Sequence, residues 1–354
     1  MKPLPAIDET YLTYHVDMFG KRIADGLDQL LLKYPVAKSP EHKYLELLIN
    51  FNGKAGRLLV ALAADLRRLT SRVEMLFRYG GFSASALDAV NDGLSKIFDY
   101  DAFMRRRGTP RKRWGGLRLL EVLSEAVKFC PYCNAETVYA IKFKRKPGTD
   151  FDHIAVKSAL DHFYPRSRYP FLALSLYNLI PSCTRCNSGL KRDRYARITC
   201  VAHPYIPADD LDVGMSFIPI LRDGRILQQE SPESLDQVMF VERDAHAFKR
   251  GRRYEELFAV GEVYTKLFRR EAADAIWRAV LFDGAYVDDV RKRVLKHGLL
   301  LGDVERLVYG TPVDSEEINQ HRLAKLRLDM IRLFRGGARL VDLEPGEQNK
   351  RRAS

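Results

Sequence analysis

The stretch FCPYCN, from Phe129 to Asn134, holds two cysteines separated by Pro and Tyr. This spacing is typical of two unrelated kinds of site. One is a redox pair, in which a helix dipole or a nearby cation lowers the pKa of the first thiol. The other is half of a four-thiolate zinc site. The rest of the sequence decides between them.

A second pair of the same form, CTRC, follows at Cys183 and Cys186. A redox domain has no use for a second pair, whereas a structural Zn²⁺ takes two thiolates from each of two knuckles. The sequence before Cys130 is helix-like and that after Cys133 is strand-like, the reverse of the order in a redox domain. We therefore predict a structural zinc ion held by both pairs, with a thiol–disulfide oxidoreductase as the weakest alternative. The fifth cysteine, Cys200, is expected to be a small buried hydrophobe.

The positive charge of the chain is local. Its 354 residues carry a formal net charge of +12, and residues 101–200 hold 20 Lys and Arg against 8 Asp and Glu. The whole excess therefore lies in the segment that contains every cysteine. Such a field suits a polyanion, most often the phosphate backbone of nucleic acid. A solvated basic face that keeps the protein soluble is the alternative.

A cytoplasmic location is expected from the apolar segments. The N-terminal sequence lacks the apolar core of a signal peptide. The longest apolar run, LLVALAA from Leu58 to Ala64, is too short to span a bilayer. Disulfides are rare in cytoplasmic proteins, which also favours zinc for the cysteines.

Hydrophobic periodicity predicts an α+β fold with three parts. Helical spacing dominates the N-terminal domain, residues 1–115, and again the C-terminal region, residues 206–354. The C-terminal region also contains one predicted hairpin, with Asp223-Gly224 between MSFIPIL and RILQQ. Residues 116–205 contain β-branched and aromatic runs between the cysteine pairs, which predict a small zinc-stabilised module with short strands.

Side chains suited to phosphodiester hydrolysis accompany the cysteine pairs. A neutral imidazole can accept a proton from water near neutral pH, and His162 is the candidate. Hard divalent cations prefer oxygen ligands, which Asp161 and Asn187 offer. Lys191 follows Asn187 by one helical turn, so we expect both on one face, where Lys191 would meet a phosphate.

These motifs, in the order CPYC and then LDHFYPRSRYPFLALSLYNLIPSCTRCNSGLK, resemble an HNH (ββα-metal) endonuclease of the zinc-knuckle type. They are similar in particular to HNH nucleases of bacterial anti-phage defence and retron-associated systems. The resemblance covers about Cys130 to Lys191. It implies that Asp161 and Asn187 hold a catalytic Mg²⁺ or Mn²⁺. It also implies that His162 is the general base and that Asn178 orients this base or its loop.

The function implied by the resemblance is metal-dependent endonuclease activity on nucleic acid, with DNA as the expected substrate and antiviral defence as the expected setting. Relatives often act with a separate ATPase or sensor protein, so such a partner is expected, and a membrane is not. The alternative is a zinc-knuckle nucleic-acid-binding protein without cleavage activity. A pure binder does not need the catalytic residues, and their presence favours cleavage.

Other interpretations remain open at the level of single residues. Asp152 and His153 form a rival Asp-His pair between the cysteine pairs, but this pair lacks the proline that follows His162 three residues on. His162 could also be an ordinary loop histidine, Asn178 a buried amide that bonds to the backbone, and Asn187 a helix cap.

Two groups of basic residues are predicted to contact phosphates. One lies in RRRGTPRKRW, which Gly and Pro interrupt, so that a linker is the alternative interpretation. The other follows the second cysteine pair. The predicted contacts are Arg105, Arg106, Arg107, Arg111, Lys112 and Arg113 in the first group, and Lys191 and Arg192 in the second.

Overall fold

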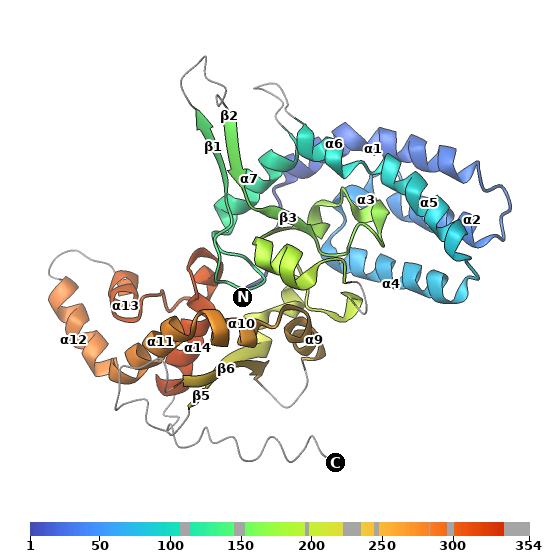
Figure 1. Ribbon diagram of the computed structural model, residues 1–354. Helices are drawn as coiled ribbons and strands as arrows, with labels where there is room; N and C mark the ends of the chain where they lie inside the picture. The colour runs from blue at the N-terminus through green and yellow to red at the C-terminus, as the bar shows by residue number, and fades with distance from the viewer. Residues whose placement is uncertain are drawn as a thin grey trace, which may run out of the picture. The chain divides into compact units, whose positions relative to one another are not determined.

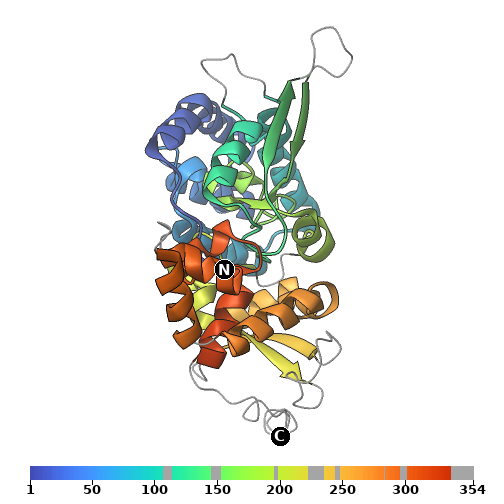
Figure 2. The ribbon, with the colours of Figure 1, turned by 90° about the vertical axis from the view of Figure 1, so that its left-hand side faces the viewer.

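The computed structural model describes residues 1–106, 114–144, 153–194, 198–221, 235–243, 248–282, 284–295 and 301–335 (Figures 1 and 2). The fold is mixed and mostly helical, and the described residues contain three two-stranded antiparallel sheets. The chain forms two compact units. The N-terminal unit consists of Pro3–Val127 and Val138–Ala208, and the C-terminal unit of Met1–Lys2, Lys128–Thr137 and Asp209–Ser354.

Helices form most of the N-terminal unit. The helical segment from Leu58 to Phe77 is interrupted near Leu62, and the one from Ser85 to Phe103 is interrupted at Phe98 and Asp99. Asp99 starts a new helix there because its side chain accepts a hydrogen bond from the backbone N–H of Ala102. The helices are α1 (Glu9–Leu31), α2 (Pro40–Asn52), α3 (Arg57–Val60), α4 (Ala63–Tyr79), α5 (Ala84–Ile97), α6 (Tyr100–Arg105) and α7 (Gly116–Ala126).

Two short antiparallel pairs of strands complete the N-terminal unit. Strand β1 (Ala140–Lys144) pairs with β2 (His153–Lys157), and β3 (Ala159–His162) pairs with β4 (Leu179–Ser182). A helical segment, η3 (Arg185–Lys191), directly follows β4. Shorter 3₁₀ turns are η1 (Pro170–Leu172), η2 (Leu176–Asn178), η4 (Ile198–Cys200) and η5 (Pro207–Asp209). The order of β3, β4 and η3 along the chain is thus strand, strand, helix, with the short turns η1 and η2 between the two strands.

The C-terminal unit has one hairpin among helices. Strand β5 (Met215–Leu221) agrees with the predicted first strand, and its partner is β6 (Leu235–Glu242). The predicted second strand, RILQQ, lies outside the described residues. The apolar stripe of helical spacing that begins at Tyr254 is largely buried and forms part of the core. The helices are α8 (Leu211–Gly214), α9 (Lys249–Phe258), α10 (Val260–Leu267), α11 (Arg269–Leu281), α12 (Gly284–Leu295), α13 (Leu301–Tyr309), η7 (Ser315–Gln320) and α14 (Ala324–Arg335).

No helix within the described parts of the chain combines the length and the apolar character needed to cross a membrane.

Candidate functional site

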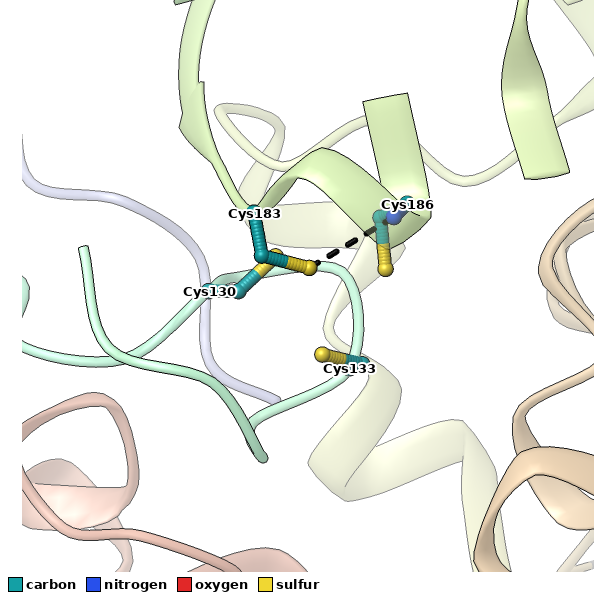
Figure 3. A group of neighbouring side chains, drawn as sticks. All are labelled: Cys130, Cys133, Cys183 and Cys186. Carbon is teal, nitrogen blue, oxygen red and sulfur yellow. Dashed lines mark hydrogen bonds between the residues drawn. The ribbon is translucent and has the colours of Figure 1, made fainter. Parts of the chain in front are cut away.

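The four cysteines of the two CxxC pairs form one buried cluster (Figure 3). The sulfur atoms of Cys130, Cys133, Cys183 and Cys186 all lie within 4.8 Å of one another. All four side chains are buried. Four thiolates are the donor set of a closed tetrahedral zinc site, which leaves no position for a reacting water. The predicted set of cysteines is therefore confirmed as a cluster that can hold a structural zinc ion.

A tight backbone turn presents the first two thiols. The N–H groups of Cys133 and Asn134 both donate to the carbonyl oxygen of Cys130, at 3.2 and 2.7 Å. The N–H of Cys130 donates in turn to the carbonyl of Glu136 at 2.8 Å. Asn134 closes the turn with a φ of 52°, a left-handed conformation in which Asn is several-fold enriched among non-Gly residues.

Asn134 also anchors this turn within the C-terminal unit. Its Nδ2 donates to the carbonyl of Ile318 at 2.7 Å, and its Oδ1 accepts from the N–H of Lys325 at 3.1 Å. A fully buried amide with partners on both sides holds the turn in one position. No role of Asn134 is predicted from the sequence, although an Asn directly after a CxxC pair is the signal for it.

Two tyrosines of the C-terminal unit support the same turn. The hydroxyl of Tyr254 donates to the carbonyl of Tyr132, and that of Tyr264 donates to the carbonyl of Cys133, both at 2.7 Å. The ring of Tyr132 stacks on Phe258, with centroids 4.4 Å apart. These contacts give hydrogen-bond donors to buried backbone carbonyl groups of the turn.

The second pair of thiols lies where β4 leads into η3. The N–H of Cys186 points to the sulfur of Cys183 at 3.5 Å, an interaction that stabilises a thiolate. The N–H of Asn187 donates to the carbonyl of Cys183 at 3.0 Å.

Cys200 is exposed and outside the cluster, so the expectation that it is buried is wrong. It belongs to a surface 3₁₀ turn, η4, rather than to the core.

Asp161 and His162 lie at the end of β3, where the strand stops. Asp161 is paired with Ile180 across the sheet, and His162 with Leu179. The ammonium of Lys191 donates to Oδ1 of Asp161 at 2.9 Å and to the carbonyl of His162 at 2.6 Å. Lys191 is 1% exposed and Asp161 is 3% exposed. The predicted contact of Lys191 with a phosphate does not fit this position, because its charge is buried against a carboxylate.

The imidazole of His162 is held in one tautomer. Its Nε2 lies 3.0 Å from the carbonyl oxygen of Ala173, which can only accept a hydrogen bond, so Nε2 carries the proton. Nδ1 therefore presents its lone pair. The Tyr100 ring packs against the imidazole in a T-shaped arrangement, with centroids 4.4 Å apart. Burial lowers the pKa of His162 to about 3, which keeps the ring neutral at physiological pH.

Asn178 fastens the loop that follows His162. It is fully buried and accepts from the N–H of Tyr164 at 2.8 Å through Oδ1. Its Nδ2 donates to the carbonyls of Tyr164 and Leu172, at 3.2 and 3.0 Å. These bonds close the chain between β3 and β4, and Ala173, the partner of His162, lies in that closed segment. The amide thus bonds to buried backbone and, by doing so, holds the loop that contains the partner of His162.

The remaining predicted residues lie in different surroundings. Asn187 is half-buried inside η3 rather than at its start, so it does not cap the helix. Arg192 is exposed and ends η3 with a φ of 50°. His153 pairs with Lys144 in the β1–β2 ladder, and Asp152 lies outside the described residues.

The first basic group is only partly described. Arg105 and Arg106 are exposed at the end of α6. Arg107, Arg111, Lys112 and Arg113 lie outside the described residues, and their predicted contacts with phosphate stay predictions.

Comparison with known proteins finds one short similarity. No family model and no solved structure matches the chain. A segment of 52 residues is 40% identical to "Protein ea31" of Escherichia phage lambda. The match covers 14% of this chain and 18% of the phage protein. It shows a shared segment and assigns neither a family nor a function to this chain.

Proposed function

We propose that this protein is a metal-dependent endonuclease of the zinc-knuckle HNH type, acting on DNA. The single observation that carries the proposal is the strand–strand–helix order of β3, β4 and η3. This order brings Asp161 and His162 together with Lys191. A cysteine cluster that can hold zinc lies at the start of η3. The resemblance of the sequence motif supports the same assignment.

His162 would act as the general base. Its Nε2–H donates to the carbonyl of Ala173, which leaves Nδ1 to accept a proton from the attacking water. The lowered pKa keeps this atom unprotonated at neutral pH. Asn178 would hold the loop on which this geometry depends, through its bonds to Tyr164 and Leu172.

The oxygen donors of Asp161 and Asn187 fit a hard divalent cation. When bound, Mg²⁺ or Mn²⁺ would supply positive charge for the phosphate and the leaving oxygen. Lys191 would compensate the buried charge of Asp161, because an unpaired buried carboxylate is strongly disfavoured. Lys191 would thereby hold Asp161 beside the base.

One observation favours the alternative of a nucleic-acid-binding protein that does not cut. Oδ1 of Asp161 is already engaged by Lys191 in a buried pair, and such a pair can serve a purely structural role. A defence role and an ATPase or sensor partner rest on the family resemblance alone.

Cleavage of plasmid DNA, and of RNA of matched sequence, tests the proposal. Zinc-loaded protein is assayed with and without added Mg²⁺ or Mn²⁺, since a strong chelator would also remove structural zinc. We expect DNA nicking that depends on the added cation and is lost in His162→Ala. Binding without cleavage under every condition would support the alternative.

A further inference from the structure

An arginine that the sequence motif does not single out lies close to the candidate base. The ring of Tyr100, the first residue of α6, contacts His162. The guanidinium of Arg166 lies over this same Tyr100 ring, 5.4 Å from its centroid. Tyr100 also donates from its hydroxyl to the carbonyl of Leu160 at 3.4 Å. One aromatic ring therefore connects the imidazole and the guanidinium.

The side chain of Arg166 is half-exposed to solvent, although two contacts define the position of its guanidinium. Its NH1 donates to a carboxylate oxygen of Asp101 at 3.1 Å, and the two side chains are 50% and 61% exposed. An exposed ion pair contributes little to stability, so Asp101 holds the guanidinium only weakly. The cation over the aromatic ring adds a second, directional contact. Arg166 can therefore exchange Asp101 for another anion without a change in the fold.

The neighbouring charges favour a phosphate as that anion. Arg105 and Arg106 are exposed at the end of α6, the helix that also carries Tyr100 and Asp101. A guanidinium offers a planar fork of donors that binds phosphate oxygens in a bidentate manner. Lys191, by contrast, is buried against Asp161 and does not reach solvent.

We propose that Arg166 contacts a backbone phosphate of the nucleic acid next to His162, and that Asp101 holds Arg166 in place when no nucleic acid is bound. The inference rests on the proposed function, because it takes nucleic acid as the substrate. It concerns binding rather than the chemical step.

Binding of a fluorescently labelled DNA duplex by the full chain tests this role, measured across a range of salt without added divalent cation. We expect Arg166→Gln to weaken binding about tenfold and to reduce the slope of log affinity against log salt by about one. Arg166→Lys keeps the charge and should retain most of the slope. Asp101→Asn should tighten binding, because it frees the guanidinium and removes a repelling charge.

A matched control comes from Arg57 in α3. Arg57 also lies over an aromatic ring, that of Phe51, and is also paired with a carboxylate, that of Asp65. Its side chain is 49% exposed, close to the value for Arg166. Arg57→Gln should leave binding and its salt slope unchanged.

The outcomes separate this inference from the proposed function. If Arg166 only fastened α6 to the loop, Arg166→Gln and Asp101→Asn would lower the melting temperature alike and shift binding alike, and the inference would be overturned. Unchanged binding in Arg166→Gln while the parent still cuts would also overturn it and leave the proposed function intact. A parent that binds through Arg166 but never cuts would support the inference and overturn the nuclease.

Discussion

Lys191 donates to Asp161 at 2.9 Å within a pair of side chains that are almost wholly buried. The same ammonium bonds to the carbonyl of His162, so one cation connects the helical segment η3 with the last two residues of β3. A buried charge pair of this kind depends strongly on both partners, since the loss of either leaves an uncompensated charge.

Replacement of Lys191 by Met is therefore expected to lower the free energy of unfolding by about 3–5 kcal/mol. Urea unfolding at neutral pH measures this change. The double variant Lys191→Met with Asp161→Asn should recover part of the loss. Lys21→Met, which breaks an exposed pair with Asp25, serves as the control and should change stability little. Equal effects of the buried and exposed substitutions would contradict the buried pair.

The purified protein is expected to carry about one Zn²⁺ per chain, because four buried thiols lie within reach of one ion. Elemental analysis measures the zinc content. The variant with Cys130→Ala and Cys183→Ala should lose the metal and fold poorly, whereas Cys200→Ala should keep both metal and fold. Parent protein free of zinc, or a folded double variant, would count against the site.

His162→Ala is expected to bind DNA and retain zinc but to cut about a hundred- to ten-thousand-fold more slowly, because it loses the proton acceptor. Asp161→Ala should lose cleavage together with its dependence on Mg²⁺. His153→Ala should cut nearly as well as the parent. Loss of cleavage in His153→Ala, together with retained cleavage in His162→Ala, would assign the catalytic role to the rival pair, Asp152 and His153.

Neutralising Arg111, Lys112 and Arg113 together is expected to weaken binding to all sequences and to reduce the salt slope by about three. Phosphate contacts carry no sequence information, so the effect should not depend on the DNA chosen. Neutralising three exposed cations elsewhere, Lys21, Arg68 and Lys96, is the control. An unchanged slope would show that the basic strip is a linker.

Acid is expected to destabilise the N-terminal unit through His15. Its Nε2–H donates to the carbonyl of Leu174 at 2.8 Å, and its Nδ1 accepts from the indole of Trp114 at 2.9 Å. Burial lowers the pKa of His15 from about 6.5 to about 4. The unfolded chain thus binds a proton that the folded chain excludes. The contribution of neutral His15 to the free energy of unfolding is fully present above pH 6.5. It is lost as the pH falls towards 4, by at most about 1.4 kcal/mol per pH unit.

His15→Gln keeps a donor and an acceptor but does not titrate. Unfolding free energies of parent and variant at pH 7.5 and pH 5 give the contribution of His15, since the other buried histidines are common to both proteins. The parent should lose more stability on acidification than the variant. Parallel pH profiles would show that His15 does not contribute.

The sequence alone was enough to identify the four cysteines that cluster and to predict short strands between the two cysteine pairs. Thiol spacing, strand propensity and a following Pro are local features, and local features can be read along the chain. The helical stripes of the C-terminal region are predictable for the same reason, since their period follows from the geometry of a single helix.

The surroundings of these residues were decided only by the tertiary structure. The sequence around Lys191 predicts an exposed cation, but packing buries its side chain against Asp161. Tyr100 reaches His162 from a helix far upstream, and the same Tyr100 ring contacts the guanidinium of Arg166. Asn134 acquires its role through hydrogen bonds with Ile318 and Lys325, far along the chain. Burial and long-range hydrogen bonds arise from packing between distant segments, and no local spacing encodes which segments will meet.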